Sequence, residues 1–593
     1  MNAKEDLLRV RLLPGQDEFV FSMYSCPGDV EGLKKLVGVM KEKGLGNGFD
    51  PGPSARASSR PLFEVLAAVG WPIICYPGYS DMQIREGRCK LSDEDVAALK
   101  ILDEAGIFNA IQLGEWGYYF HNLSSDESWW KAVYGEEYDQ FAHLRMPSGL
   151  AGYATKPEGK QECYEVVKDY FRTRNRYMRG RNMSVTGHSH YETYAAEWGA
   201  HLIGLEVGEN IAFTQSKIAF ARGASRQFQK PWSLQMSPWF HGSCTTRGPL
   251  VKEGKYARGI DAGHSLSLTV RMWLHGWFAG AALVTPENSL VTFFETKDVG
   301  GPLSVYGEKA REVFSFTRKQ ERGTPYTPIA VVLDEYAGYN GYRGRPWGIL
   351  EPTQGDQEIT DLFQQQLFPG SDHIHRPADP ENPESTYLRP TPFGELFDVL
   401  RSNASGKVFA SYPVLLLVGD IESSRDLLSR LDFALREGSR VLLHPRHIKA
   451  LTEEALSRLQ EAGSVEALEP WTNPDTGRST AISNERLREL CEEFSPFSVS
   501  GDPIQYQINK THRGWVVELV NNDGVIKFPD RPAETDPSAV ATVTLSPRFA
   551  VAKATAWSGE LHLKQDKAIV RIPPGETAFV EFVKSTAEKV SER

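Results

Sequence analysis

Eight short apolar runs, each followed by a helical or long connecting segment, occupy the chain from about Phe19 to Gly323. Strands that alternate with helices pair in parallel, because each helix returns the chain to the end of the sheet at which the previous strand began. Eight such units close into a barrel, which leaves no strand edge exposed. We therefore predict an α/β fold that begins with a (β/α)8 TIM barrel, with strands at residues 20–26, 47–50, 72–78, 109–116, 183–190, 202–210, 232–239 and 281–288.

Start and stop signals of the intervening helices support this prediction. Asp29 is placed to cap a helix after the first strand, and Gly44 is placed to end it. Ser92 and Asp95 have the spacing of a capping box, and Gly106 ends that helix ahead of the fourth strand. The second strand, at 47–50, is short and Gly-rich and has the weakest signal.

The pattern changes after a Gly- and Pro-rich break at 323–328. Apolar runs at 329–335, 414–420 and 441–445 alternate with a helical stretch, which predicts a smaller doubly wound α/β domain. The stretch from about 326 to 490 contains no cysteine, which excludes thiol chemistry there and indicates a structural domain.

From about Gly501 onward, apolar residues alternate with period two between turn signals, which predicts a C-terminal antiparallel β-sandwich. The Pro- and acid-rich stretch from Pro377 to Thr391 is expected to be a surface loop. The predicted domains are residues 1–325, 326–495 and 496–593.

Composition limits the classes of partner. The formal net charge of −11 provides no basic footprint, so nucleic acid is not an expected partner. The chain has no run of 18 apolar residues and no apolar leader, so we expect a cytoplasmic protein without membrane contact, or a periplasmic or secreted one if a leader was removed. Six scattered cysteines without CxxC spacing indicate reduced thiols. Glycine motifs for phosphates or dinucleotides are also missing, and we expect no cofactor.

Glutamates stand at several predicted carboxyl ends of barrel strands, the face where barrel enzymes place their active sites. These residues are Glu115, Glu206, Glu209 and Glu287. Cleavage of an acetal needs one carboxylic acid to protonate the leaving oxygen and one carboxylate to attack carbon or activate water. The structural alternative is that some of these glutamates only pair with arginines, such as Arg222, Arg226 or Arg271.

Glu206 and Glu287 are the preferred catalytic pair. Glu206 lies within an apolar strand, where an unpaired charge is expensive, and Glu287 follows a proline on the last strand. Glu115 and Glu209 are the next candidates. Near these strand ends, Trp116 and Trp239 offer flat apolar faces for a sugar ring.

The segment TGHSHYETY contributes His188, His190 and Glu192 at the end of the fifth predicted strand. We expect these side chains to hydrogen-bond substrate hydroxyls or to support a glutamate. In the alternative, the two imidazoles point the same way and share a metal ion, which would indicate a metal-dependent hydrolase or a polysaccharide lyase. His241 and His264, after the seventh strand, are further polar candidates.

The order of barrel, cysteine-free α/β domain opening with TPIAVVLDE, and β-sandwich ending in IPPGETAFVEF resembles glycoside hydrolases related to family 42 β-galactosidases. The resemblance implies a middle domain that is similar to a glutamine amidotransferase without its chemistry and that contributes to a homo-oligomer. Members of that family carry an Asn-Glu pair after the fourth strand and a nucleophilic Glu after the seventh. Here Gly114 precedes Glu115, and the seventh run, WSLQMSPW, has no carboxylate. The partner of Glu115 is therefore expected on the sixth or eighth strand.

Together these features predict an exo-acting glycoside hydrolase that cleaves a terminal sugar from an oligo- or polysaccharide by carboxylate catalysis. A further alternative is a barrel that binds carbohydrate without cleaving it.

Overall fold

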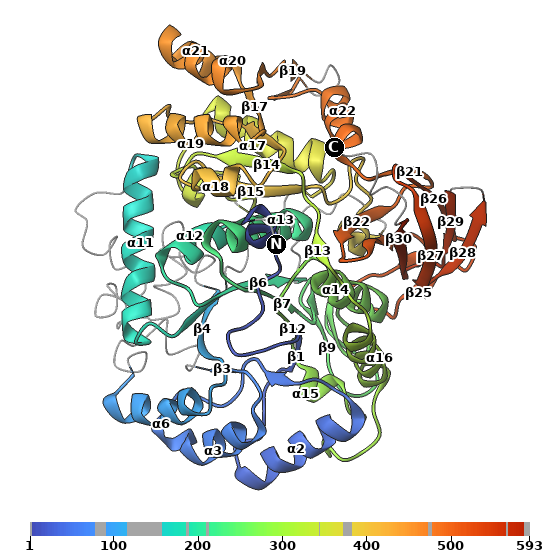
Figure 1. Cartoon of the computed structure of the whole chain (residues 1–593). Coiled ribbons are helices and arrows are strands. Elements are labelled where there is room, and N and C mark those ends of the chain that lie inside the picture. Colours follow the sequence, from blue (N-terminus) through green and yellow to red (C-terminus); the bar gives the residue numbers. More distant parts are fainter. Residues whose placement is uncertain are drawn as a thin grey trace.

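The barrel that the sequence predicts is present and closed. The structure, a computed structural model, describes residues 3–76, 91–115, 157–185, 189–208, 213–342, 344–371, 382–472, 477–564 and 567–585. Neighbouring barrel strands are parallel throughout, and the last strand pairs with the first (Figure 1). In barrel order the strands are β1 (Val20–Met23), β2 (Gly48–Phe49), β3 (Ile73–Cys75), β4 (Asn109–Glu115), β5 (Asn182–Val185), β6 (Leu202–Val207), β7 (Trp232–Met236) and β12 (Leu283–Pro286). All eight predicted strands are confirmed.

Helices surround the barrel and begin where their capping residues predict. Asp29 accepts a hydrogen bond from the backbone N–H of Gly32 at 2.8 Å, and Ser92 forms the expected capping box with Asp95. Gly44 ends its helix in the left-handed region, with φ at 67°. The principal barrel helices are α2 (Val30–Lys43), α3 (Arg60–Val69), α6 (Asp93–Glu104), α11 (Lys160–Tyr177), α12 (Glu192–Trp198), α13 (Thr214–Phe228), α14 (Leu266–Phe278) and α16 (Val305–Lys319).

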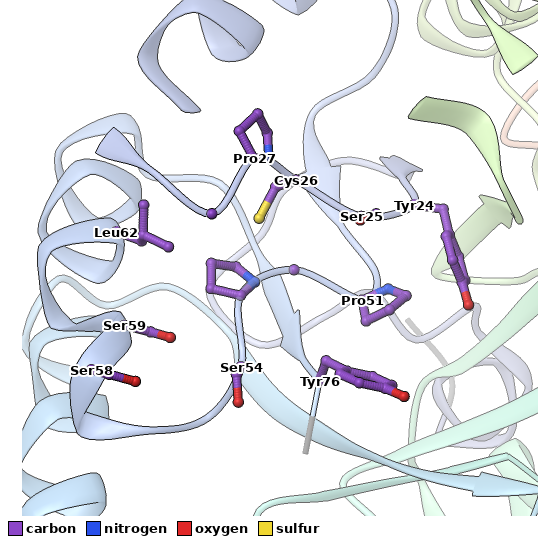
Figure 2. Close-up of a pocket in the computed structure, with 13 residues that line it drawn as sticks. Tyr24, Ser25, Cys26, Pro27, Pro51, Ser54, Ser58, Ser59, Leu62 and Tyr76 are labelled. Carbon is purple, nitrogen blue, oxygen red and sulfur yellow. The ribbon is translucent and has the colours of Figure 1, made fainter. Parts of the chain in front are cut away.

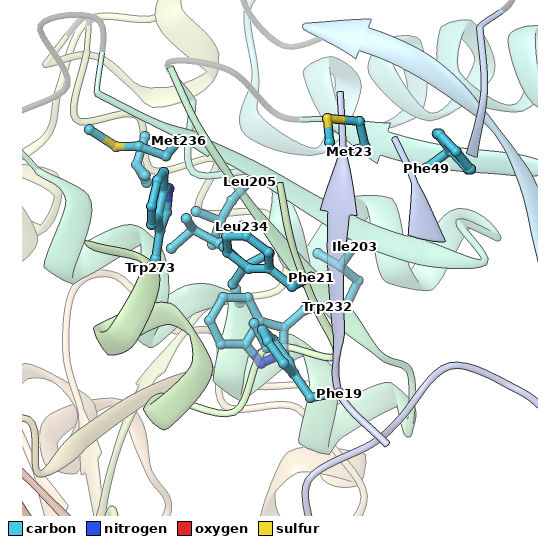
Figure 3. Packing of buried hydrophobic residues seen from close by; sticks show 14 of the residues in the cluster. Phe19, Phe21, Met23, Phe49, Ile203, Leu205, Trp232, Leu234, Met236 and Trp273 are labelled. Carbon is cyan, nitrogen blue, oxygen red and sulfur yellow. The ribbon is translucent and has the colours of Figure 1, made fainter. Parts of the chain in front are cut away.

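Alternate residues of the strands pack on opposite sides of the barrel wall. The outward-facing Phe21 packs against Trp273 of α14 in the layer between strands and helices, and Trp232 belongs to the same cluster (Figure 3). The inner side begins with a separate apolar cluster near the amino ends of the strands, which includes Leu202 and Leu283. Further along the same strands the inward positions are polar, so the lumen opens as a polar site at its carboxyl end.

A small sheet follows β7 and forms part of the wall at this end. Its strands are β8 (Trp239–Phe240), β9 (Ser243–Thr245), β10 (Val251–Glu253) and β11 (Tyr256–Gly259). A short helix, α15 (Ser289–Thr292), follows the last barrel strand.

The middle part of the chain forms a parallel five-stranded sheet with strand order β15-β14-β16-β17-β18. The predicted runs correspond to β14 (Ile329–Leu333), β16 (Val414–Leu417) and β17 (Arg440–Leu443). Two further strands are β15 (Phe397–Arg401) and β18 (Val465–Ala467), and the accompanying helices include α17 (Gln354–Asp361), α18 (Gly406–Phe409), α19 (Arg425–Arg436), α20 (Pro445–Ala450), α21 (Glu453–Ala462) and α22 (Asn484–Phe494). The predicted domain 326–495 is not free of cysteine, because Cys491 lies on α22. This thiol is buried, and burial raises its pKa to about 12, which keeps it protonated.

The C-terminal part consists mainly of two antiparallel sheets. Most of their buried apolar side chains belong to one hydrophobic cluster, whereas Val516, Val520 and Phe579 belong to the cluster that includes the barrel. One sheet contains β13 (Thr324–Pro325), β22 (Gln505–Lys510), β23 (Gly514–Val520), β30 (Thr577–Lys584) and β27 (Val551–Ser558). The other contains β21 (Phe497–Gly501), β26 (Ala541–Pro547), β29 (Lys567–Ile572) and β28 (Glu560–Lys564). The predicted period-two alternation therefore corresponds to antiparallel strands.

Helix α13 lies between the barrel and the middle sheet (Figure 1). A Cβ atom on Gly223 would lie 1.8 Å from the carbonyl oxygen of Val399 on β15, so only glycine permits this approach. On the same helix, Arg222 Nε donates to Asp398 Oδ1 at 2.8 Å, and Arg226 also pairs with Asp398. All three of these charged side chains are buried.

The segment predicted as a surface loop at 377–391 is largely buried where the structure describes it, although Ser385, Arg389 and Pro390 are half-buried. Glu384, Tyr387 and Leu388 are each at most 3% exposed, because the segment packs beside α14 at the wall of the barrel mouth. This expectation was wrong for a physical reason: Glu384 finds hydrogen-bond donors in the barrel that compensate the burial of its charge.

Every helix among the described residues is too short or too polar to cross a membrane.

Candidate functional site

Two of the predicted catalytic glutamates face the carboxyl end of the barrel lumen. Glu206 pairs in register with Gln235 of β7, and register partners on parallel strands point to the same side of the sheet. Gln235 Nε2 lies 3.5 Å from Glu287 Oε2, at the outer limit of a hydrogen bond. Gln235 also accepts a hydrogen bond at 3.2 Å from Gln112 of β4, across the lumen. The sixth, seventh and eighth strands thus bring Glu206 and Glu287 to the two sides of one buried amide.

The arginines that could have neutralised these glutamates are directed elsewhere. Arg222 and Arg226 pair with Asp398, and Arg271 donates to Asn522. The structural alternative based on these three arginines is therefore not supported for Glu206 and Glu287.

Tyr24 follows β1 and lies close to both glutamates. Its backbone N–H donates to Ser289 Oγ at 2.7 Å, which fixes it beside the segment that carries Glu287. Burial raises the pKa of the Tyr24 phenol, and the negative charges of Glu287 and Glu206 raise it further. At neutral pH this side chain is a neutral hydrogen-bond donor beside the two carboxylates.

A third carboxyl group, Asp50, lies at the end of β2 and was not identified from the sequence. Its side chain is fully buried, and Thr285 Oγ1 donates to its Oδ2 at 2.7 Å. Ser22 contacts the same threonine hydroxyl at 2.8 Å. Burial raises the pKa of Asp50 to about 7, although the hydrogen bond from Thr285 lowers it. The signal was present as an aspartate that ends the weak second strand, but its burial depends on residues more than two hundred positions away.

A pocket of about 530 Å³ opens beside Tyr24, at the ends of the first three barrel strands (Figure 2). Its walls include the hydroxyl groups of Tyr24, Tyr76, Ser25, Ser54, Ser58 and Ser59. The described lining contains no Asp, Glu, Lys, Arg or His side chain. Cys26 is also in the wall, but burial raises its pKa to about 12 and keeps the thiol protonated. The pocket is thus uncharged and rich in hydroxyl groups.

Trp239 and His241 lie in the small sheet after β7, at the wall of the mouth. The guanidinium carbon of Arg258 lies 4.4 Å from the centroid of the Trp239 ring, so one face of the indole is already covered. His241 has a φ of 48° in the turn between β8 and β9, and its ring contacts Phe240. Contact of either residue with substrate stays a prediction.

His190 and Glu192 are placed in the protein interior instead of the pocket wall. His190 Nε2 contacts Ser216 Oγ at 2.9 Å, and its Nδ1 accepts from the backbone N–H of Gly341 at 3.3 Å. Glu192 accepts from Lys217 at 2.9 Å, and both side chains are fully buried. These contacts favour structural roles, and they occupy the ring nitrogens of His190 that the metal alternative requires. No group of three His, Cys, Asp or Glu side chains in the described part of the chain is arranged to hold a metal ion.

The remaining predicted site residues cannot be placed in the same way. Trp116, His188 and Glu209 lie outside the described residues. Glu115 ends β4, where its backbone is paired with Val185 of β5, and its side chain is outside the described set.

Comparison with known proteins finds distant structural similarity only. No protein-family model matches the sequence, and no curated protein matches it. The chain is similar to a solved GH42 β-galactosidase, with 11% sequence identity and a TM-score of 0.48 over 97% of this chain and 100% of that one. It is also similar to α-L-fucosidase isoenzyme 2 from Paenibacillus thiaminolyticus, with 11% identity and a TM-score of 0.45 over 96% and 100% of the two chains. A β-galactosidase from Halorubrum lacusprofundi is 12% identical, with a TM-score of 0.41 over 95% of this chain and 99% of that one. A reaction has to be inferred from the residues at the barrel mouth, because a fold alone does not determine one.

Proposed function

We propose that the protein is an exo-acting glycoside hydrolase that removes a terminal neutral sugar from an oligo- or polysaccharide. The observation that carries the proposal is the approach of Glu206 and Glu287 to the two sides of Gln235 at the carboxyl end of the barrel. Two carboxyl groups on opposite sides of a scissile bond are what acid/base cleavage of an acetal requires.

The surroundings of the pair support this chemistry. One carboxyl group protonates the leaving oxygen while the other stabilises or attacks the positive charge that develops at the anomeric carbon. The neutral phenol of Tyr24 and the amide of Gln235 are donors in the same place, and each can orient a carboxylate or a sugar hydroxyl.

The pocket beside Tyr24 supports a neutral sugar as the substrate. Its volume lies within the range of small-ligand pockets, and its hydroxyl-rich walls can exchange hydrogen bonds with a polyol. Among the described residues, the lining offers no charged partner for a sulfate or carboxylate group on the substrate.

The test is the hydrolysis of a panel of neutral methyl glycosides of both anomers, whose alkoxide leaving groups need protonation by the general acid. We expect Glu206→Gln and Glu287→Gln each to lower kcat about a thousandfold, because an amide neither donates nor accepts the catalytic proton. The exposed Glu295, close to the same loop, provides the control: Glu295→Gln should retain the kcat of the wild type.

The mode of action is tested on a reduced oligosaccharide of the sugar that the panel selects. Stepwise release of single sugars from the non-reducing end is expected, whereas internal fragments would contradict an exo mode. Near-normal turnover in both Gln variants would contradict the carboxylate pair. Binding of a glycan without cleavage across the panel would instead support the non-catalytic alternative.

A further inference from the structure

A buried Glu–His pair lies in the wall beside Glu287. Glu384 belongs to η6 (Pro383–Thr386), in the segment that precedes β15, whereas His264 directly precedes the cap of α14. Glu384 Oε1 lies 3.1 Å from His264 Nδ1 and accepts the backbone N–H of Ser265 at 2.7 Å. His264 and Glu384 are only 1% and 3% exposed. The carboxylate therefore selects the tautomer in which Nδ1 carries the proton.

The rest of the imidazole is fixed by packing. The ring is stacked on Phe240, with centroids 4.6 Å apart, and contacts the edge of Tyr387 at 5.0 Å. Its Nε2 lies against Gly208, where an added Cβ would be 3.3 Å away. Gly208 directly follows β6, the strand of Glu206, so the free side of the ring is directed toward the strand ends of the candidate site.

Between His264 and Glu287 there is a small cavity of about 20 Å³. His264, Trp273, Ser237 and Glu287 are among the residues that line it. In the described part of the chain, His264 Nε2 and Trp273 Nε1 have no hydrogen-bond partner, and both residues are 1% exposed. A cavity of this size accommodates one water molecule, and buried waters occur where two to four polar atoms converge.

We propose that this cavity holds one water molecule that joins His264 to Glu287, and that His264 is a positioning residue which keeps Glu287 in its ionised form. The water accepts the indole N–H of Trp273, donates one proton to His264 Nε2 and donates the other to the Glu287 carboxylate. Every hydrogen of the water and both orphan nitrogens are then satisfied. A hydrogen bond to a carboxylate favours its charged state.

This arrangement rests on the proposed function and divides the two catalytic roles. Glu287 is the nucleophile or base, and Glu206 is the general acid. Other titratable or charged groups on neighbouring elements surround His264, the water and Glu287. Those near His264 are Asp261, Tyr306, Glu384 and Lys527, and those near Glu287 are Tyr24, Glu206 and Cys244, with Arg258 beside Cys244.

The water site is tested without a substrate, by a high-resolution crystal structure of the whole chain. We expect one ordered water within hydrogen-bond distance of His264 Nε2, Trp273 Nε1 and a carboxylate oxygen of Glu287. A dry cavity, or a water that does not reach Glu287, overturns the proposal.

The role of His264 is tested by the pH dependence of kcat/KM in Glu384→Leu, which removes the acceptor of the Nδ1 proton, and in His264→Gln. Loss of the hydrogen bond from the water to the charged Glu287 should lower kcat/KM about tenfold on the acidic side of the pH profile. The rise of kcat/KM on that side should move to higher pH. Above that rise, where Glu287 ionises unaided, the activity should return toward that of the wild type. Glu384→Leu leaves the imidazole in place and removes only its acceptor, so it provides the test even where His264→Gln does not fold.

Glu287→Gln separates the two proposals. If Glu287→Gln is inactive while both variants of the pair keep the pH profile of the wild type and lose only thermal stability, the pair is a structural link and this inference alone fails. If Glu287→Gln retains full activity, the proposed function fails and the role of His264 fails with it.

Discussion

At the scale of one residue, Asp50 shows how the barrel wall changes the chemistry of a carboxyl group. Glu206, Glu287 and Asp50 all influence Tyr24, yet Asp50 lies fully buried beside a single donor hydroxyl. Carboxyl groups in different surroundings can hold different protonation states at the same pH. Asp50 is therefore a candidate for a carboxylic acid that stays neutral near Glu206 and Glu287.

We expect Asp50→Asn to remove a pH dependence of stability. Because the pKa of Asp50 is about 7 in the folded state against 3.8 ordinarily, the folded protein retains a proton that the unfolded chain has lost between these values. The free energy of unfolding therefore falls as the pH rises through this window, by a few kcal/mol at most. Asn is neutral at every pH, so the thermal midpoint of the variant should rise relative to the wild type between pH 5 and pH 8.

Thr285→Val provides the matched comparison for this carboxyl group. It removes the hydrogen bond that lowers the pKa of Asp50, so the fall in stability should shift to higher pH. A parallel pH dependence in the wild type, Asp50→Asn and Thr285→Val, measured by calorimetry, would contradict the assignment.

The sequence identified Glu206 and Glu287 because each ends an apolar run, which is a local signal. Asp50 ends only a weak strand signal, and His264 was a polar candidate without a predicted partner. The roles of Asp50, Gln235 and His264 depend on partners on distant segments. Thr285 meets Asp50 across 235 positions, and Glu384 meets His264 across 120. Periodicity reports which side of a strand a residue occupies, but it does not report what faces that residue across the lumen.

At the scale of secondary-structure elements, the predicted strands had the correct number and order but were too long at their ends. The sixth run was expected to span 202–210, whereas β6 ends at Val207. A barrel strand ends where its neighbours cease to pair, and the sequence of one strand does not indicate that point. The prediction for the acid-rich stretch around Glu384 was wrong for another reason. Its composition indicated exposure, whereas tertiary contacts bury it.

Helix α13 offers a test in which packing and helix propensity have opposite effects. Gly223→Ala should favour the isolated helix by about 1 kcal/mol, but its Cβ would overlap the Val399 carbonyl and force α13 away from β15. Because this contact involves rigid backbone, we expect a net loss of about 1–3 kcal/mol in the free energy of unfolding.

Gly38 on α2 is the control for that helix substitution. It lies at an exposed position in the middle of the helix, and nothing lies within 4 Å of an added Cβ. Gly38→Ala should therefore stabilise the protein by up to about 1 kcal/mol. Equal effects of the two substitutions in chemical denaturation would contradict the close packing of α13.

At the scale of the whole molecule, the barrel and the middle sheet are joined by a buried polar cluster around Asp398. This carboxylate accepts Arg222 Nε, Thr327 Oγ1 and Tyr412 OH, each at 2.8 Å. Burial acts to raise the pKa of Asp398, but Arg226 and Arg222 outweigh it and lower the pKa. The cluster replaces the solvent that these charges lose at the interface.

Asp398→Ala should lower the free energy of unfolding by about 3–5 kcal/mol, because it leaves two buried guanidinium groups without their shared partner. A depressed carboxyl pKa contributes stability above its unfolded value and loses that contribution as the pH falls through the folded value. The difference between variant and wild type should therefore shrink in acid. Glu312→Ala removes an exposed partner of Lys309 and should change stability by less than about 1 kcal/mol. Similar losses in both variants would contradict the special role of the interface.

The short strand β13 directly follows the barrel, yet it pairs with β22, whose Lys510 lies opposite Thr324. The end of the barrel segment is thereby hydrogen-bonded to the C-terminal sheet, while residues 326–495 lie between them in the sequence. Genetic exchange that transferred residues 1–325 alone would leave this edge of the C-terminal sheet unpaired and remove Glu384 from the wall of the mouth. The barrel therefore depends on the rest of the chain, and we expect all three parts to occur together in related proteins.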